Sequence, residues 1–346
     1  MYKRQSVDTK VDDKTLFELY LPAFYDALME GGSYSVMGAY NKYDGEFCCE
    51  NATLLKKILR DLWHYDGVTI SDWGGVHNTE KTALNGVDME MSVTPDFDDY
   101  KLANPLLEKV KSGKIDESVI DERIERILTM MERIKLGDKT RNKGCTNTKD
   151  HQQTIQQIAE EGIVLLKNDT AHLPLSKETK KILVLGDNAK RTHAAGGGSA
   201  EIKALYDISP LLGMRMVLGG DAQIDWLPGY YVDNEKHVAG EVDWQAESLD
   251  VDYTTDRGKE QFDKEIRPIR EKYLKEALDA CPSYDEVIFI GGLNHAYDVE
   301  GFDRPDMTLP YGQNEVIEAL TEKCKNLTVV LINGGPVEMP WINKAN

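Results

Sequence analysis

The sequence predicts an α/β protein in which most strands are parallel and the chain forms roughly two domains. Short apolar segments without polar alternation are followed in turn by segments with helical spacing. This order is typical of parallel strands that are buried on both faces and joined by right-handed crossovers. A polar, unpatterned stretch over residues 138–150 separates two such series. The length of 346 residues also suits two domains of ordinary size.

The first series opens with a helix. Apolar side chains at helical spacing predict it over residues 13–30. Asp12 or Asp13 supplies an N-cap and Gly31 ends the helix. Pro22 lies inside the pattern, where a proline ring can kink a helix.

The rest of the first series alternates strands and helices. Residues 67–73, GVTISDW, are rich in β-branched side chains, which favour strands. Residues 51–63 have the spacing of an amphipathic helix. In chain order we expect a strand over 35–40, a helix over 51–63, a strand over 67–73, a helix over 77–86, a short strand over 87–91, and helices over 102–113 and 115–137.

The second series repeats the alternation. Residues 286–292, EVIFIGG, form the most strongly predicted strand of the chain. Residues 227–257 are polar, aromatic and glycine-bearing, and we expect a long surface excursion there. The expected helices cover 151–162, 208–220, 259–281 and 312–324, and the expected strands cover 163–168, 181–187, 222–227, 286–292 and 326–334.

Composition excludes several classes of function. The chain has 41 basic and 60 acidic residues and a net charge of −19. A charge this negative repels phosphate backbones and anionic lipids, so we expect neither nucleic acid nor a membrane as a partner. The apolar fraction of 41% is that of an ordinary globular protein. No apolar run approaches the roughly 18 residues of a spanning helix.

Cysteine and histidine spacings do not predict a metal site, and we expect no cofactor. The five cysteines are odd in number and none of their spacings is that of a metal site. We expect reduced thiols and therefore a cytoplasmic protein, and the first residues lack the apolar core of a signal peptide. The seven histidines show no metal-binding spacing such as H-E-x-x-H.

Candidate functional residues follow the expected strands, because function collects at the carboxyl ends of parallel strands. Tyr40 ends one strand, and Asp72 and Trp73 end the next. A sugar that stacks on the indole would present its anomeric carbon to this carboxylate. Alternatively, Asp72 caps the helix that starts near His77.

Three further features have more than one interpretation. Glu300 follows the strand over 286–292 and is either a catalytic acid or an ion-pair partner of Arg304. The GGGSA stretch over 196–200 resembles a phosphate-binding loop, but it lacks the sequence of a Walker or dinucleotide-binding loop. Asp88 and Glu90 alternate along the expected strand over 87–91, and we expect a structural role for at least one of them.

Six motifs resemble those of glycoside hydrolase family 3 and follow one another in the order of that family. They are VMGAYN through SDWGG over 36–75, NGVDMEM, EEGIVLLKND with LPL, GGGSAEI, EGFDRPDMTLP and NGGPVEMPW. The resemblance covers nearly the whole chain. It implies the C-terminal part of a (β/α)8 TIM-like barrel over residues 1–137, a linker over 138–154, and an α/β sandwich domain with a mostly parallel sheet over 155–346.

The resemblance also implies roles for single residues. The aspartate of the family's S-D-W motif is the nucleophile and falls on Asp72. The glutamate before G-F-D-R is the acid/base and falls on Glu300. The residues implied to contact the sugar are Arg4, Tyr40, Trp73 and Ser199.

The implied activity is that of a retaining exo-β-glycosidase, most simply a β-glucosidase acting on β-linked gluco-oligosaccharides or aryl glucosides. Such enzymes hold a nucleophile and an acid/base about 5–5.5 Å apart, so docking of the two domains would assemble the site. A β-xylosidase and a non-catalytic carbohydrate-binding or interaction module are the alternatives. A whole (β/α)8 barrel takes about 250 residues, so we expect a fragment whose first barrel half precedes Met1 and whose sandwich ends early. Whether the protein forms a homo-oligomer stays open.

Overall fold

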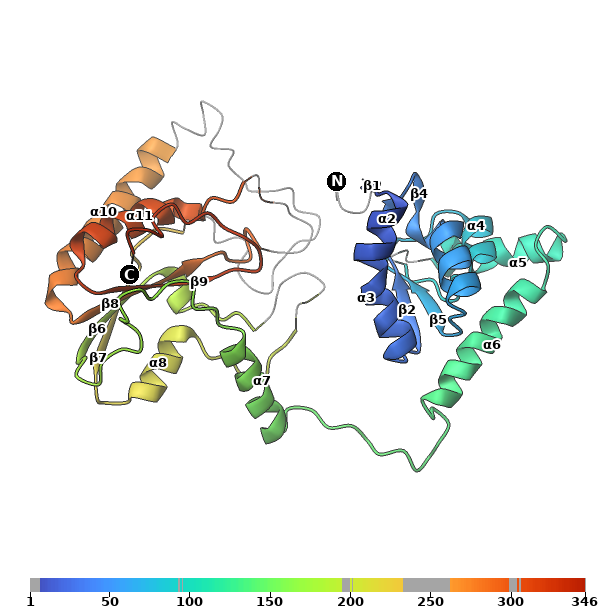
Figure 1. Cartoon of the computed structure of the whole chain (residues 1–346), viewed down its shortest axis with the longest axis horizontal. Coiled ribbons are helices and arrows are strands. Elements are labelled where there is room, and N and C mark those ends of the chain that lie inside the picture. Colours follow the sequence, from blue (N-terminus) through green and yellow to red (C-terminus); the bar gives the residue numbers. More distant parts are fainter. Residues whose placement is uncertain are drawn as a thin grey trace. The chain divides into compact units, whose positions relative to one another are not determined.

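The computed structural model describes residues 7–92, 94, 96–194, 200, 202–232, 262–298, 304 and 306–345. The chain divides into two compact units, Met1–Gly144 and Cys145–Asn346 (Figure 1). Both units combine helices with parallel strands. This confirms the α/β class that the alternating pattern predicts.

The first unit begins with the long helix predicted over residues 13–30. Its successive segments are α2 (Asp13–Thr15), a π-helical stretch (Leu16–Tyr20), α3 (Leu21–Tyr25) and a second π-helical stretch (Asp26–Glu30). The carboxylate of Asp12 accepts the N–H of Thr15 at 2.9 Å, so Asp12 is the N-cap. Pro22 lies in the first turn of α3, and the widened turns before and after it let the helix continue through the proline.

Two parallel strands form the centre of the first unit. β2 (Ser35–Gly38) pairs with β5 (Val68–Ser71), with Gly38 opposite Ser71. A π-helical segment over Thr53–Leu62 connects them and buries Leu55, Ile58 and Leu59.

The third strand expected in this unit, over 87–91, is wrong in extent, since it forms a single bridge between Ile70 and Met89. The N–H of Thr69 bonds to the carboxylate of Asp88 at 2.8 Å instead of to a backbone carbonyl. A side chain has therefore replaced one ladder bond.

Three helices complete the first unit. They are α4 (Thr79–Asn85), α5 (Asn104–Lys111) and α6 (Ser118–Arg133). A small sheet that the sequence pattern does not predict joins β1 (Asp8–Thr9), β3 (Lys42–Tyr43) and β4 (Glu46–Phe47).

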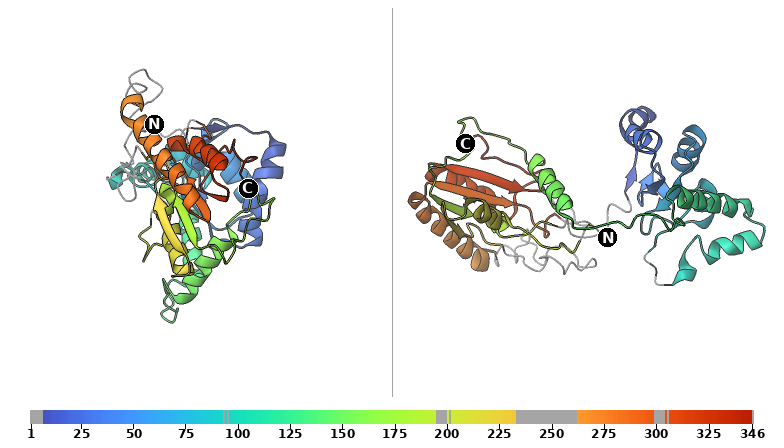
Figure 2. Two further views of the ribbon diagram at one scale, coloured as in Figure 1. Left: turned by 90° about the vertical axis from the view of Figure 1, so that its left-hand side faces the viewer. Right: turned by 90° about the horizontal axis from the view of Figure 1, so that it is seen from below.

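The second unit is a four-stranded parallel sheet with helices on both faces. The sheet contains β6 (Lys181–Leu185), β7 (Gln223–Leu227), β8 (Glu286–Gly292) and β9 (Leu327–Ile332), in the order β7-β6-β8-β9. Alternate residues of β6 and β8 pack into two separate cores. One core includes α10 (Arg267–Ala280) and α11 (Gln313–Lys323), and the other includes α8 (Pro210–Leu218) (Figure 2). This arrangement explains why these strands have continuous apolar sequences.

Three predicted segments of the second unit have different outcomes. The helix α7 (Lys149–Glu161) forms as predicted, but the strand predicted over 163–168 is wrong. Residues 163–168 have no strand pairing, and Ile163 is 78% exposed. A strand exists only where a neighbour pairs with it, and an apolar sequence does not reveal the neighbour. Most of the excursion expected over 227–257 lies outside the described residues.

A lysine connects the beginning and the end of the second unit. The ammonium of Lys167 donates hydrogen bonds to the carbonyl oxygens of Ile342 at 2.9 Å and Ala345 at 2.6 Å. Its side chain is largely buried. The turn formed by Trp341–Ala345 is thereby fixed against the segment that follows α7.

None of the helices in the described part of the chain combines the length and the apolar character needed to cross a membrane.

Candidate active site

Asp72 follows the last residue of β5 at the carboxyl end of the strand pair. Its backbone N–H donates to the carbonyl of Gly38 at 2.9 Å, which continues the pairing of β2 and β5 by one residue. Its Oδ1 accepts the N–H of Trp73 at 2.7 Å. That is the one hydrogen bond of this carboxylate among the described residues, and the residue is half-buried. The carboxylate therefore keeps lone pairs that no donor of the described residues occupies.

The structure rules out the alternative that Asp72 caps the helix near His77. The N-cap of α4 is Asn78, whose side chain accepts the N–H of Lys81 at 3.0 Å. Asp72 instead forms a turn, in which its carbonyl accepts the N–H of Gly75 at 3.1 Å. The residue that caps this helix is therefore Asn78, which directly follows His77, and not Asp72.

The turn after Asp72 brings two strand ends together through Gly75. A Cβ at this position would lie 3.2 Å from the Asp72 carbonyl oxygen and from Cys49 Sγ, and 3.5 Å from the Cα of Tyr40. A larger side chain would push these segments apart. Cys49 is buried here and its Sγ donates to the Gly38 carbonyl at 3.3 Å. Burial raises the pKa of this thiol to about 12, so it stays protonated.

A buried glutamate holds the loop that leads from Asp72 to α4. Glu50 Oε1 accepts the backbone N–H groups of His77 at 2.8 Å and Asn78 at 2.6 Å. The His77 ring stacks on Phe47 with centroids 3.6 Å apart, and burial lowers the pKa of His77. Sequence reasoning missed Glu50. Its one signal is a charged residue directly before the amphipathic helix over 51–63.

The predicted sugar-binding residues are only partly within the described chain. Tyr40 is half-buried and follows β2, and Trp73 is 51% exposed and follows β5. Tyr40, Asp72 and Trp73 thus lie at one edge of one strand pair. The other three predicted site residues, Arg4, Ser199 and Glu300, lie outside the described residues.

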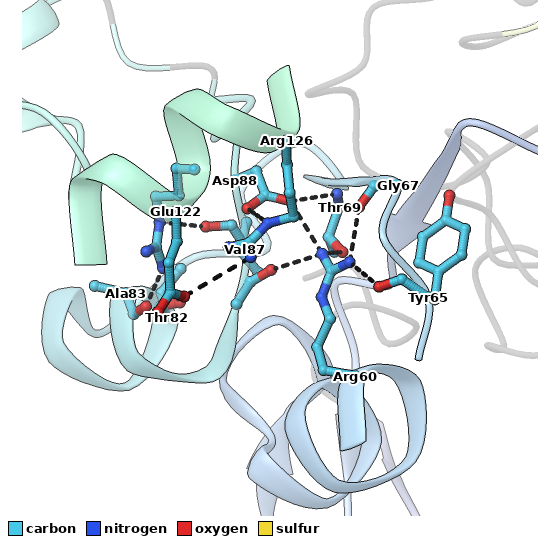
Figure 3. Close-up of polar contacts among 12 residues, drawn as sticks. Arg60, Tyr65, Gly67, Thr69, Thr82, Ala83, Val87, Asp88, Glu122 and Arg126 are labelled. Atoms are coloured by element: carbon cyan, nitrogen blue, oxygen red, sulfur yellow. Dashed lines mark hydrogen bonds and ion pairs between the residues drawn. The ribbon is translucent and has the colours of Figure 1, made fainter. Parts of the chain in front are cut away.

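An ionic network lies beside the same strands and is centred on Asp88 (Figure 3). Its side chain is fully buried and contacts Arg60 at 3.1 Å and Arg126 at 2.8 Å. Arg60 also donates to the carbonyls of Tyr65 and Gly67, both at 2.7 Å. The expectation of a structural role for Asp88 or Glu90 is confirmed, since Asp88 joins β5 to the π-helical segment and to α6.

Arg123 adds a third buried cation to this region. It donates to the Val87 carbonyl at 2.9 Å and to the carbonyl of Ala83. Burial is the main cause of a pKa lowered to about 10. Backbone carbonyls accept the hydrogen bonds of this guanidinium. Arg123 thereby fixes the chain between α4 and Met89, the residue that bridges to β5.

In the second unit, side-chain amides order the carboxyl ends of β6 and β8. Asn188 donates to the carbonyls of Gly291 at 2.9 Å and Leu293 at 3.0 Å. Gln313 forms a paired contact with Gly292, accepting its N–H and donating to its carbonyl, both at 2.8 Å. These bonds define where the loop after β8 begins, and Glu300 lies in that loop by sequence.

The loop after β8 is also attached to the turn after β9. The carboxylate of Asp298 accepts the N–H of Gly334, and Arg304 donates to the Pro336 carbonyl at 2.7 Å.

The described residues contain no group of three side chains suited to a metal ion. The five cysteines are free thiols.

Both parts of the chain match models of one family. Residues 3–130 match the glycosyl hydrolase family 3 N terminal domain, and residues 163–346 match the glycosyl hydrolase family 3 C-terminal domain. Beta-glucosidase BoGH3A of Bacteroides ovatus is 36% identical over 99% of this chain and 45% of its own length. Thermostable beta-glucosidase B of Acetivibrio thermocellus is 34% identical over 99% of this chain and 40% of its own.

The fold has close counterparts among solved structures. The GH3 beta-glucosidase of Bifidobacterium adolescentis superposes with a TM-score of 0.77 at 26% identity, over 99% of this chain and 44% of that protein. The chain thus spans less than half the length of each of these relatives.

Proposed function

This chain belongs to glycoside hydrolase family 3, and on that premise we propose that the whole protein is a retaining exo-β-glycosidase, most simply a β-glucosidase. Its substrates would be β-linked gluco-oligosaccharides or aryl glucosides. The similarity to proteins named beta-glucosidase supports the sugar. The reaction would proceed through a covalent glycosyl-aspartate.

The observation that carries the proposal is the state of Asp72. A nucleophilic carboxylate needs a lone pair free to attack and a fixed position. Among the described residues the side-chain oxygens of Asp72 accept one hydrogen bond, and its backbone is held by the strand pair. The exposed indole of Trp73 offers an apolar face beside it for a sugar ring.

We assign the acid/base role to Glu300. Its support is the E-G-F-D-R sequence and its place in the loop after β8, whose start is ordered by Asn188 and Gln313. In the first step this group would protonate the leaving oxygen, and in the second it would deprotonate water. Arg4, Tyr40, Trp73 and Ser199 would bind the sugar.

Covalent trapping tests the nucleophile. The whole protein is incubated with 2,4-dinitrophenyl 2-deoxy-2-fluoro-β-D-glucoside and digested, and the peptides are analysed by mass spectrometry. We expect one fluoroglucosyl mass on the peptide that contains Asp72, because the fluorine slows breakdown of the intermediate more than its formation. Labelling of another carboxylate would overturn the assignment.

A leaving-group series tests the acid/base. Glu300→Ala should greatly slow cellobiose hydrolysis, whose leaving group needs a proton. Formation of the glycosyl-enzyme from a dinitrophenyl glucoside should change little, and azide should then speed its breakdown. Equal losses on both substrates without an azide effect would mean that the acid lies elsewhere.

A substrate panel separates the alternatives. The kcat/KM values for aryl β-D-glucoside and aryl β-D-xyloside decide between glucosidase and xylosidase. Binding of cellobiose without any hydrolysis would indicate a carbohydrate-binding module instead.

A further inference from the structure

The strand order of the second unit makes β6 and β8 a special pair. β7 lies on one side of β6, while β8 and β9 lie on the other. The connections leaving β6 and β8 therefore run in opposite directions, which makes this pair the topological switch point of the sheet. In open α/β sheets, ligands bind outside the carboxyl ends of the strands at this point.

The two strands approach each other closely at that edge. Gly186, directly after β6, has a φ of +105°, and a Cβ there would lie 2.1 Å from the Ile290 carbonyl oxygen. Asn188 then bonds across to the residues that end β8. The loops after β6 and β8 consequently start from one rigid point.

Each of these two loops contributes a histidine. His193 follows β6 and His295 follows β8, and their rings meet edge to face with centroids 6.5 Å apart. The Nε2 of His193 is buried and has no hydrogen-bond partner among the residues that the structure describes. Buried polar atoms in folded proteins almost always have a partner, so this nitrogen indicates a place where a water or a ligand atom binds.

The charged groups around His193 are already paired. Arg191 forms an ion pair with Asp187, and Asp298 accepts the N–H of Gly334. Burial lowers the pKa of His193, the neighbouring His295 and Arg191 lower it further, and Asp187 and Asp298 oppose them. A neutral imidazole has one N–H donor and one acceptor nitrogen, which suits an uncharged partner.

We propose that His193 and His295 form a leaving-group subsite that binds the hydroxyls of the sugar released from an oligosaccharide. The inference rests on the proposed glycosidase function and deepens it. A hydroxyl both donates and accepts, as a neutral imidazole does. Metal chemistry is not favoured by the described side chains, and an anion would compete with Asp187 for Arg191.

The position along the chain agrees with this role. His295 precedes Glu300 by five residues in the same loop, a length of chain that spans at most about 18 Å. The departing sugar must lie beside the group that protonates its oxygen. The loops after β6 and β8 are therefore the part of the second unit that the leaving sugar would meet.

Two substrates separate binding of the leaving sugar from proton donation. Cellobiose and phenyl β-D-glucoside both need a proton on the leaving oxygen, but only cellobiose presents leaving-group hydroxyls. In the whole protein, His193→Phe and His295→Phe should lower kcat/KM for cellobiose about 10- to 100-fold. The same variants should change kcat/KM for phenyl glucoside less than about threefold.

Two further variants guard against indirect effects. His193→Gln restores a nitrogen near the Nε2 position and should recover part of the cellobiose rate. His151→Phe replaces an exposed histidine of α7 and should change neither substrate.

Every outcome bears on the proposal. Equal losses on both substrates would mean that the histidines act through the acid/base, and no loss on either would mean that water alone binds there. Either result overturns the subsite while the glycosidase stands. A wild-type protein that hydrolyses neither substrate overturns the proposed function, and the subsite with it.

Discussion

Asp72 and Asp88 are two aspartates of one unit that contact the same strand, β5, yet their surroundings differ fundamentally. The carboxylate of Asp88 is fully buried and receives the N–H of Thr69 and the guanidinium groups of Arg60 and Arg126. Asp72 lies one residue past the strand end and is half-buried, and its carboxylate accepts one hydrogen bond within the described part of the chain. The first is a buried, paired structural anion, and the second has free acceptor capacity among the described residues.

The difference shows that the number of hydrogen-bond donors around a carboxylate distinguishes a structural aspartate from a candidate nucleophile. Arg60 and Arg126 compensate the cost of burying Asp88, and the fully buried carboxylate is closed to a substrate. Neither arginine forms a hydrogen bond or an ion pair with Asp72. An aspartate at a strand end is a candidate nucleophile only where its neighbours leave it unsatisfied.

The sharpest test of the comparison is Asp72→Asn. The amide keeps the shape but removes the nucleophilic oxygen, so kcat for aryl glucoside hydrolysis in the whole protein should fall on the order of 10³-fold or more. The melting temperature should stay within about 2 °C, because only one short hydrogen bond changes. A variant that keeps a tenth of the wild-type rate would break the comparison.

Asp88→Asn should show the opposite pattern. It leaves Arg60 and Arg126 buried without their anion, which should lower the free energy of unfolding by about 3 to 5 kcal/mol. Urea denaturation followed by tryptophan fluorescence measures this. The matched control is Asp66→Asn, whose partner Arg133 forms a solvent-exposed ion pair and whose loss should cost about 1 kcal/mol or less. Similar costs for the two variants would contradict a structural role specific to Asp88.

Trp73→Ala addresses the surroundings of Asp72. If the indole binds sugar, its removal should lower kcat/KM about tenfold through lost stacking and leave the melting temperature nearly unchanged. Leu84→Ala, at a similarly exposed apolar residue of α4, is the control and should change neither quantity. A drop in melting temperature without a drop in kcat/KM would make Trp73 a packing residue.

The smallest expected effect concerns pH and the loop that follows Asp72. The pKa of His77 is lowered from 6.5 in the folded protein, chiefly by burial, so the unfolded chain binds the proton more readily. The contribution of His77 to the free energy of unfolding is therefore complete above about pH 6.5, and it is lost as the pH falls toward the pKa of the folded state. His77→Phe keeps a ring against Phe47 and should reduce the loss of melting temperature between about pH 7.5 and pH 5.5 by roughly 1 °C. An unchanged pH profile would show that His77 is not involved.

The hydrophobic pattern of the sequence predicted the strands that are buried on both faces and the helices that have regular apolar spacing. β6 and β8 are buried on both faces, and their unbroken apolar sequences reflect that. The helix over residues 13–30 and its cap at Asp12 follow from spacing and from one side-chain hydrogen bond. The position of Asp72 at a strand end also followed from the pattern, because β5 is one of these apolar strands.

Features that depend on distant partners did not follow from the sequence. The strand predicted over 87–91 shrank to a bridge because Asp88 supplies a ladder bond through its side chain. Residues 163–168 have strand-like composition but no pairing partner. The orphaned Nε2 of His193 and the bonds of Glu50 depend on residues brought close only by the fold.

The two hydrogen bonds of Lys167 have a consequence for how the second unit matures. Their partners, Ile342 and Ala345, lie 175 and 178 residues further along the chain. At about 5–20 residues per second, a ribosome takes on the order of 10 to 35 seconds to add that length. During this interval the ammonium of Lys167 remains hydrated, and the segment after α7 lacks these two contacts. Contacts of such sequence separation are slow to form and are made after local ones, so the turn formed by Trp341–Ala345 is attached late. Trp341, which is 2% exposed in the folded unit, is accessible to chaperones or to aggregation until then.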